Sequence, residues 1–203
     1  MLLIPLLYGQ EKIPDMSLKL LNGKSTNLYQ LLGDGPIVID FWATWCSPCK
    51  KLMKHLDRFH KHFNEYGLKV LAVSTDTPRS MGKVKSFIRS NQYDFLVGLD
   101  PNQQVMKKCK AEIMPTTIIL DKEGNVIYRH QGYYPGDEEK ILKTIHDYYD
   151  KLGVKYKKIT YFLFFLIVLI SFLMYSSKII HGAKKIHKLS DSCSIISFKR
   201  RLL

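Results

Sequence analysis

The sequence predicts an α/β fold, a mixed central sheet flanked by helices, followed by one C-terminal transmembrane helix. Short apolar runs alternate with amphipathic patterns of helical period along residues 11–152, which is typical of layered α/β domains. A pair of cysteines, Cys46 and Cys49, follows one of these runs where a helical pattern begins. A different apolar segment, residues 159–177, contains no charged side chain. With 203 residues, the chain is long enough for one domain with such appendages.

The first half of the domain is predicted to form a hairpin and then a strand–helix–strand unit. Asn22-Gly23 is a strong hairpin turn signal between two short segments. A continuous apolar run predicts a buried parallel strand. Large apolar residues spaced three and four apart predict the next helix, which Gly67 ends. We therefore predict strands at residues 17–21, 26–28, 37–42 and 68–74 and a helix over residues 49–66.

The second half alternates helices with short strands and ends on a helix. Pro78 favours a helix start, because proline fits the first turn of a helix. The polar run 121–125 contains a glycine and predicts a hairpin turn. We therefore predict helices over residues 77–90, 100–110 and 137–152 and strands at residues 95–99, 117–120 and 126–128.

The uncharged segment 159–177 is predicted to be a single membrane-spanning helix. Its 19 residues would span about 28 Å as a helix, close to the thickness of a bilayer's hydrocarbon core. Tyr161 and Tyr175 lie near its two ends, as interfacial anchors do. We therefore expect a lipid membrane as a partner through residues 159–177, with residues 153–158 as a basic linker and residues 178–203 as a basic tail.

The formal charge of +13 is concentrated toward the C-terminus. Residues 178–203 carry seven Lys and Arg against one Asp, whereas residues 1–158 carry 24 against 17 acidic residues. Because the basic tail follows an apolar segment, it favours a membrane explanation, and no nucleic acid is predicted as a partner. The cationic excess after the segment predicts a cytoplasmic tail and an extracytoplasmic domain. The alternative is a tail-anchored protein whose domain stays cytosolic.

The first ten residues bear on the predicted extracytoplasmic location of the domain, which requires an export signal. Residues 1–10 are largely apolar and read as a possible signal-peptide remnant, although no basic region precedes them. The alternative is an N-terminus that is frayed or packs on the domain. An export signal is needed if the domain is to lie outside the cytoplasm.

The stretch Cys46-Ser47-Pro48-Cys49 is the strongest chemical signal in the chain. A thiol at a helix N-terminus is stabilised as a thiolate by unpaired amides and by the helix dipole, which suits thiol–disulfide exchange. A zinc site needs two further ligands, and none lies at a suitable spacing. A copper site would need a third ligand such as His130 or Met114. We therefore predict no metal and no cofactor beyond a redox-active Cys46–Cys49 disulfide; a non-catalytic binding module such as a metallochaperone remains the alternative.

These residues carry a resemblance to the thioredoxin superfamily. Residues 40–50 read Asp-Phe-Trp-Ala-Thr-Trp-Cys-Ser-Pro-Cys-Lys, and Met114-Pro115-Thr116 follows. With the insertion at residues 95–110, the chain resembles the TlpA/ResA branch over about residues 15–152. That branch consists of membrane-anchored, outward-facing thiol–disulfide oxidoreductases, usually anchored at the N-terminus rather than the C-terminus. A peroxiredoxin would need a threonine three residues before the reactive cysteine, where this chain has Ala43.

The resemblance assigns roles to individual residues of a thioredoxin-like domain spanning residues 11–152. It implies that Cys46 is the nucleophile and Cys49 the resolving thiol. It makes Asp40 a buried carboxylate that relays a proton for Cys49; the alternative is an Asp bonded to backbone amides at a strand end. It makes Pro115 a cis-proline beside the cysteines. The residues expected to contact substrate are Trp45, Ser47, Pro48, Met114 and Thr116.

The resemblance also implies partners. It favours a reductant that acts on protein thiols and disulfides and receives electrons from an upstream thiol donor. Two other cysteines have no predicted redox role: Cys109 is expected to be a packing residue and Cys193 a free thiol in the tail.

Overall fold

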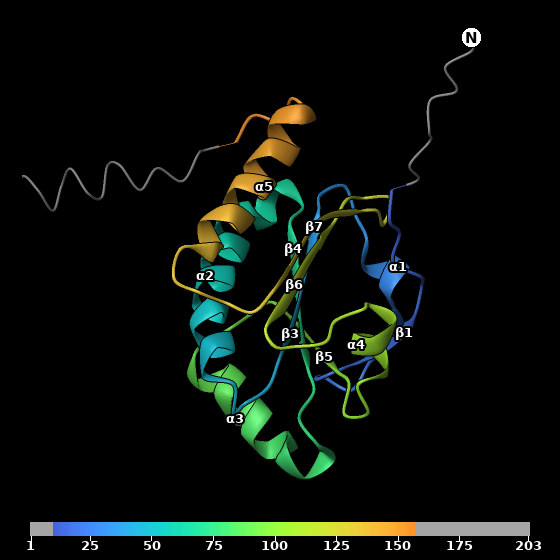
Figure 1. Ribbon diagram of the computed structural model, residues 1–203, viewed down its shortest axis with the longest axis vertical. Helices are drawn as coiled ribbons and strands as arrows, with labels where there is room; N and C mark the ends of the chain where they lie inside the picture. The colour runs from blue at the N-terminus through green and yellow to red at the C-terminus, as the bar shows by residue number, and fades with distance from the viewer. Residues whose placement is uncertain (1–9, 157–203) are drawn as a thin grey trace, which may run out of the picture. The chain divides into compact units, whose positions relative to one another are not determined.

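A seven-stranded mixed sheet forms the centre of the computed structural model, which describes residues 10–156 (Figure 1). Its strand order is β2-β1-β5-β4-β3-β6-β7. The strands β3, β4 and β5 run parallel, and the other neighbouring pairs are antiparallel. The strand bounds are Ser17–Leu20 (β1), Ser25–Asn27 (β2), Ile37–Trp42 (β3), Lys69–Ser74 (β4), Leu96–Leu99 (β5), Thr116–Leu120 (β6) and Val126–Gln131 (β7).

Helices cover both faces of this sheet (Figure 1). One face carries the longer helices α2 (Ser47–Phe63), α3 (Met81–Ser90) and α5 (Asp137–Lys151), and the other carries α1 (Leu28–Leu31) and α4 (Gln104–Lys108). Short 3₁₀ helices at Asn64–Tyr66 and Pro78–Ser80 extend α2 and precede α3. The sheet is therefore the middle layer of three, and its central strands are shielded from water on both sides.

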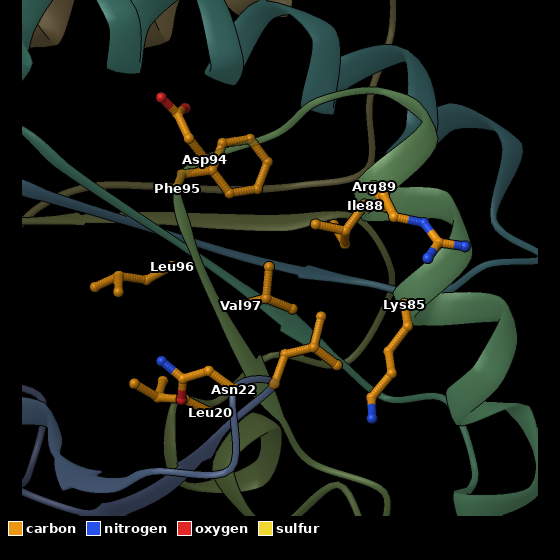
Figure 2. Close-up of a pocket in the computed structure, with 10 residues that line it drawn as sticks. Leu20, Asn22, Lys85, Ile88, Arg89, Asp94, Phe95, Leu96 and Val97 are labelled. Atoms are coloured by element: carbon orange, nitrogen blue, oxygen red, sulfur yellow. The ribbon is translucent and has the colours of Figure 1, made fainter.

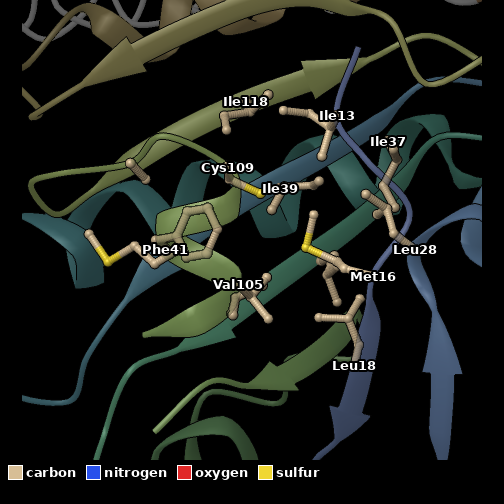
Figure 3. Close-up of a cluster of buried hydrophobic side chains, with 14 of the residues drawn as sticks. Ile13, Met16, Leu18, Leu28, Ile37, Ile39, Phe41, Val105, Cys109 and Ile118 are labelled. Carbon is tan, nitrogen blue, oxygen red and sulfur yellow. The ribbon is translucent and has the colours of Figure 1, made fainter. Parts of the chain in front are cut away.

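The central strand β3 is buried along its whole length. Its side chains alternate between the two faces, as strand geometry requires. Ile39 and Phe41 enter the core on the α4 side, together with Met16 and Val105 (Figure 3). Trp42 points to the opposite face, where its ring lies 5.3 Å from that of Phe87 in α3. By the same alternation Asp40 lies on the α2 face of the sheet.

Cys109 belongs to the core on the α4 side (Figure 3). Its side chain is only 1% exposed, and burial raises the pKa of its thiol to about 12. A thiol that is both buried and protonated packs as a small apolar group. The prediction that Cys109 is a packing residue is confirmed.

Two glycines bring the starts of β3 and β4 together. Gly67 ends the 3₁₀ extension of α2 with φ of 90°, a left-handed conformation that favours glycine. A Cβ placed on Gly35 would lie 2.5 Å from the carbonyl carbon of Gly67, so the two turns touch backbone to backbone. Only glycine at both positions allows this approach, which sets the two parallel strands side by side.

The structure corrects the predicted helix over residues 100–110. The observed helix α4 covers only Gln104–Lys108, because Gln103 and Lys110 both have positive φ values, 56° and 52°. The buried carboxylate of Asp100 accepts a hydrogen bond from the amide of Met106 at 2.8 Å and so replaces a helical partner. The short helix α1 was not predicted, and β7 continues to Gln131 because it pairs with β6 along that length.

Tyr156, the last of the described residues, packs on two helices: its ring lies 5.7 Å from that of Phe63 in α2 and 5.4 Å from that of Tyr149 in α5. Between residues 10 and 156, no helix is long and apolar enough to cross a membrane. The predicted membrane helix at 159–177, the basic tail at 178–203 and residues 1–9 lie outside the described residues.

Candidate active site

The two cysteines lie where β3 leads into α2. Cys46 is the N-cap of α2, and a disulfide joins it to Cys49, with the two Cα atoms 5.3 Å apart. Cys46 is 5% exposed and Cys49 is fully buried. The amide of Cys49 donates to the Sγ atom of Cys46 at 3.3 Å. Because the first turn of α2 has no acidic residue, the positive end of the helix dipole is not neutralised there.

The turn that precedes Cys46 is held by a buried carboxylate, Asp76, which is 2% exposed. Its two oxygens accept hydrogen bonds from the amide of Thr44 at 2.8 Å and from the Thr44 hydroxyl at 2.6 Å. The hydroxyl of Ser74 donates to the same carboxylate at 3.0 Å. Sequence reasoning missed Asp76. The available signal was the polar run that follows β4, since parallel neighbours end at the same edge of a sheet.

A second loop, which contains Pro115, is tied to the end of β3, the strand that leads to the cysteines. The Met114–Pro115 peptide bond is cis, as the resemblance implied. Thr75 ties this loop to the end of β3, because its hydroxyl lies 3.2 Å from the sulfur of Met114 and 3.3 Å from the carbonyl oxygen of Trp42. The cis-proline loop and the loop that leads to Cys46 therefore share an anchor.

The side chain of Gln131, at the end of β7, fixes the other side of the cis-proline loop. Its Oε1 atom accepts from the amides of Glu112 at 3.0 Å and Ile113 at 3.3 Å. The carbonyl of Pro115 accepts from the amide of Gly132 at 2.7 Å. No backbone hydrogen bond within residues 10–156 uses the amide or carbonyl of Met114. Sequence analysis missed Gln131, because nothing in its neighbourhood marks it as a clamp.

Asp40 is a buried carboxyl group on the face of β3 that α2 covers. It is fully buried, and burial raises the pKa of its carboxyl group to about 8, although a hydrogen bond from the Thr117 hydroxyl at 2.9 Å opposes this rise. The other oxygen, Oδ2, has no hydrogen-bond partner among the described residues. A carboxyl group with a pKa near neutrality, buried on the same side as Cys49, has the properties of a proton carrier.

The residues predicted to contact substrate fall into two groups. Trp45, 71% exposed, Ser47 and Pro48 lie at the surface around Cys46, and Met114 is half-buried. Thr116 is fully buried, and its hydroxyl donates to the carbonyl of Ile113 at 2.5 Å, so its side chain shapes the loop.

Metal ligands do not gather around the cysteines in the described part of the chain. No group of three or more His, Cys, Asp or Glu side chains within residues 10–156 could hold a metal ion. His130, considered as a copper ligand, has its Nε2 atom 3.1 Å from a carboxylate oxygen of Asp137 at the start of α5.

Comparisons with known proteins agree with this geometry. The family model described as the AhpC/TSA family matches residues 10–129. The chain belongs to the AhpC/TSA family. This AhpC/TSA protein is 35% identical over 135 residues to the thiol-disulfide oxidoreductase ResA of Bacillus subtilis, covering 66% of this chain and 70% of that protein. It is 29% identical over 136 residues to ResA of Bacillus thuringiensis subsp. konkukian, covering 66% and 77%.

The fold of this AhpC/TSA protein is thioredoxin-like. It is similar to the solution structure of an uncharacterized thioredoxin-like protein from Porphyromonas gingivalis, with a TM-score of 0.58 and 30% identity, covering 66% of this chain and 90% of that one. The resemblance to the thioredoxin superfamily and its TlpA/ResA branch is confirmed.

Proposed function

We propose that this protein is a membrane-tethered reductant that breaks disulfides in other proteins, with its domain on the extracytoplasmic side. The observation that carries the activity is the Cys46–Cys49 disulfide at the N-terminus of α2, together with a cis-proline loop that Thr75 ties to the end of β3. Together with the family and its ResA relatives, this makes the chain a thioredoxin-like thiol–disulfide oxidoreductase.

The reaction begins with the Cys46 thiolate of the reduced chain. It attacks one sulfur of a substrate disulfide, that S–S bond breaks, and the departing substrate thiolate takes up a proton. Cys49 then loses its proton and attacks the Sγ atom of Cys46. This step closes the Cys46–Cys49 disulfide and releases the second substrate sulfur as a thiol. Two electrons have passed to the substrate, and an upstream thiol donor returns two electrons to the chain.

Asp40 accepts the proton of Cys49 in this scheme, through a water molecule. Proton transfer between groups of similar pKa is efficient, and burial places the pKa of Asp40 at about 8, near that of an ordinary thiol. The unpartnered Oδ2 atom is available for this contact.

The substrate is held by its backbone as well as by its sulfur. The amide and carbonyl of Met114, which no backbone partner within residues 10–156 uses, pair with an extended substrate segment. Trp45, Ser47 and Pro48 then contact the same segment around Cys46. The substrates are therefore protein segments that can be extended around a cysteine.

Reduction of insulin disulfides tests the activity directly. The full-length reduced chain is expected to reduce insulin, and Cys46→Ser is expected to lose at least ~100-fold in rate because the nucleophile is gone. Cys49→Ala is expected to accumulate a mixed disulfide that carries the substrate. Cys193→Ser, which alters a thiol outside the pair, is the matched control and should react like the natural chain. An active Cys46→Ser variant would refute the assignment.

The proposed membrane tether rests on the sequence of residues 159–177. The full-length chain is expected to stay with membranes after alkaline extraction, and Leu166→Arg is expected to weaken this association, because a charge in the bilayer centre is costly. Release of both chains alike would contradict the tether.

The orientation can be read from the cysteines themselves. After reduction, a membrane-impermeant maleimide applied to intact cells should label Cys46 and spare Cys193. The reverse pattern would show that the domain is cytosolic. Comparison of Cys46→Ser and Cys193→Ser chains assigns the label, since Cys109 is buried.

A further inference from the structure

A groove lies beside Cys46, between the turn that carries Trp45 and the helix α3. Its volume is about 570 Å³. Thr44 and Trp45 line it from one side, and Ser80, Lys83, Phe87 and Ser90 line it from the other. Because the ring of Phe87 lies against that of the buried Trp42, this part of the groove is fixed to the core. The groove is therefore a preformed surface whose wall includes Trp45, the residue that precedes Cys46 in the chain.

The exposed charges of the two segments that form this groove are cationic. Lys83 is its charged lining residue, and it forms no ion pair with any described residue. Residues 77–93 include two arginines and two lysines but no acidic residue, and residues 43–56 include three lysines and no acidic residue. The acidic residue Asp76, whose carboxylate accepts hydrogen bonds from the amide and hydroxyl of Thr44, is buried. The two segments that form the groove therefore contain no acidic residue that could neutralise their lysines and arginines.

We propose that this groove binds the part of the substrate next to its reactive cysteine and selects segments that carry Asp or Glu, with Lys83 as the specificity-determining residue. This inference rests on the proposed function. An acidic side chain in the groove would face the Lys83 ammonium, and the hydroxyl of Ser80 could donate a hydrogen bond to it, whereas that of Ser90 already donates to the carbonyl of Phe87 at 3.1 Å. Phe87 and Trp45 offer apolar surface to the rest of the segment. The preferred partners are therefore proteins with acidic residues flanking an accessible disulfide.

The expected preference is modest, because Lys83 is exposed to solvent. A single exposed ion pair changes binding by a few fold, is weakened by salt and acts mainly on the rate of association. Opposite charges on the substrate should therefore alter the second-order rate constant by about five- to tenfold at low salt.

The test uses two disulfide-bonded peptides that differ only in three residues beside the cysteine, all Glu in one and all Lys in the other. Rate constants are measured for the full-length reduced chain, for Lys83→Glu and for Lys85→Glu. Lys85 is the matched control: it is exposed on the same helix, but lines a different pocket with Leu20, Ile88 and Phe95 (Figure 2). We expect the natural chain and Lys85→Glu to prefer the acidic peptide and Lys83→Glu to prefer the basic one. The preference should shrink in about 0.5 M salt.

Each outcome decides the question. Equal rates for the two peptides with the natural chain would overturn the proposed selectivity while leaving the oxidoreductase activity intact. Equal effects of Lys83→Glu and Lys85→Glu would show a general charge effect, and would overturn the assignment to the groove. Failure of the natural chain to reduce either peptide would refute the proposed function, and the inference with it.

Discussion

At the scale of single residues, Asp40 shows how an apolar strand can carry an ionisable side chain. It occupies a position in β3 where an apolar side chain would be expected, and burial raises the pKa of its carboxyl group to about 8. Its position was visible in the sequence as one acidic residue inside a continuous apolar run. The hydrogen bond from Thr117 to Asp40 could not be predicted from the sequence, because it depends on the register in which β3 pairs with β6.

The raised pKa of Asp40 predicts how stability depends on pH. Between the unfolded pKa of about 3.9 and the folded value of about 8, the folded chain holds a proton that the unfolded chain has released. The free energy of unfolding should therefore fall as the pH rises through this window and level off above it. The asparagine in Asp40→Asn does not titrate, so this variant should not show the fall. Its free energy of unfolding, relative to that of the natural chain, should therefore increase by ~2–4 kcal/mol between pH 5 and pH 8. Urea unfolding of both oxidised chains measures this, and a difference that does not change with pH would contradict it.

The proposed role of Asp40 in catalysis predicts a kinetic effect. Asp40→Asn should slow the attack of Cys49 on the mixed disulfide by ~10²-fold, since a general base is lost. Thr117→Val should keep the base but raise its pKa further, because the hydrogen bond that lowers the pKa is removed. The pH profile of this step should then move to higher pH. Rapid-mixing measurements from pH 6 to pH 9 follow the decay of the mixed disulfide. Unchanged profiles in both variants would exclude the relay.

At the scale of elements, the helices and strands that could be predicted were those determined by their own local sequence pattern. The apolar run of β3 and the stripe of α2 were placed correctly, and Gly67 was predicted to end its helix. The helix predicted over residues 100–110 was too long, because positive φ values at Gln103 and Lys110 confine α4 to Gln104–Lys108. The clamps made by Asp76 and Gln131 were missed, since each acts across elements that are distant in the sequence; only Asp76 had a local signal, the polar run after β4.

Substitutions at three glycines can distinguish the cost of a positive φ from the cost of a close backbone–backbone contact. Gly23 has φ of 89° with no atom within 4 Å of an added Cβ, whereas Gly67 combines φ of 90° with Gly35 N at 2.9 Å. Gly35 meets backbone at 2.5 Å. Gly23→Ala should cost ~1 kcal/mol, and alanine at position 35 or 67 should cost ~3 kcal/mol or more, because backbone must move. Chemical unfolding of the three variants measures these costs, and equal losses would contradict the close approach.

At the scale of the whole molecule, the redox state of two sulfurs is coupled to folding. A reductant holds its disulfide more favourably when folded than when unfolded, and a strong oxidant shows the opposite. The family-level resemblance predicted a redox-active cysteine pair and a cis-proline at residue 115, and the fold contains the Cys46–Cys49 disulfide and a cis Met114–Pro115 bond. The direction of electron flow is a property of the complete molecule that motif spacing does not encode.

Comparing the two redox states therefore tests the proposed direction. The oxidised chain should be more stable than the reduced chain by ~2 kcal/mol, the value that chain entropy gives for so short a loop. Urea unfolding with and without excess dithiothreitol measures the difference. A reduced chain that is the more stable of the two would indicate an oxidant.

The burial of Cys49 also determines how the electron donor and the electron acceptor of the proposed reaction bind in turn. The outer sulfur, Cys46, is the one that retains any accessible surface, whereas the inner one has none. In the proposed reaction, the electron donor and the electron acceptor must therefore both react at the sulfur of Cys46. Each forms its own mixed disulfide there, so the two cannot be bound at the same time. Turnover should follow a ping-pong pattern, in which parallel lines appear when the reciprocal rate is plotted against reciprocal acceptor concentration at several donor levels.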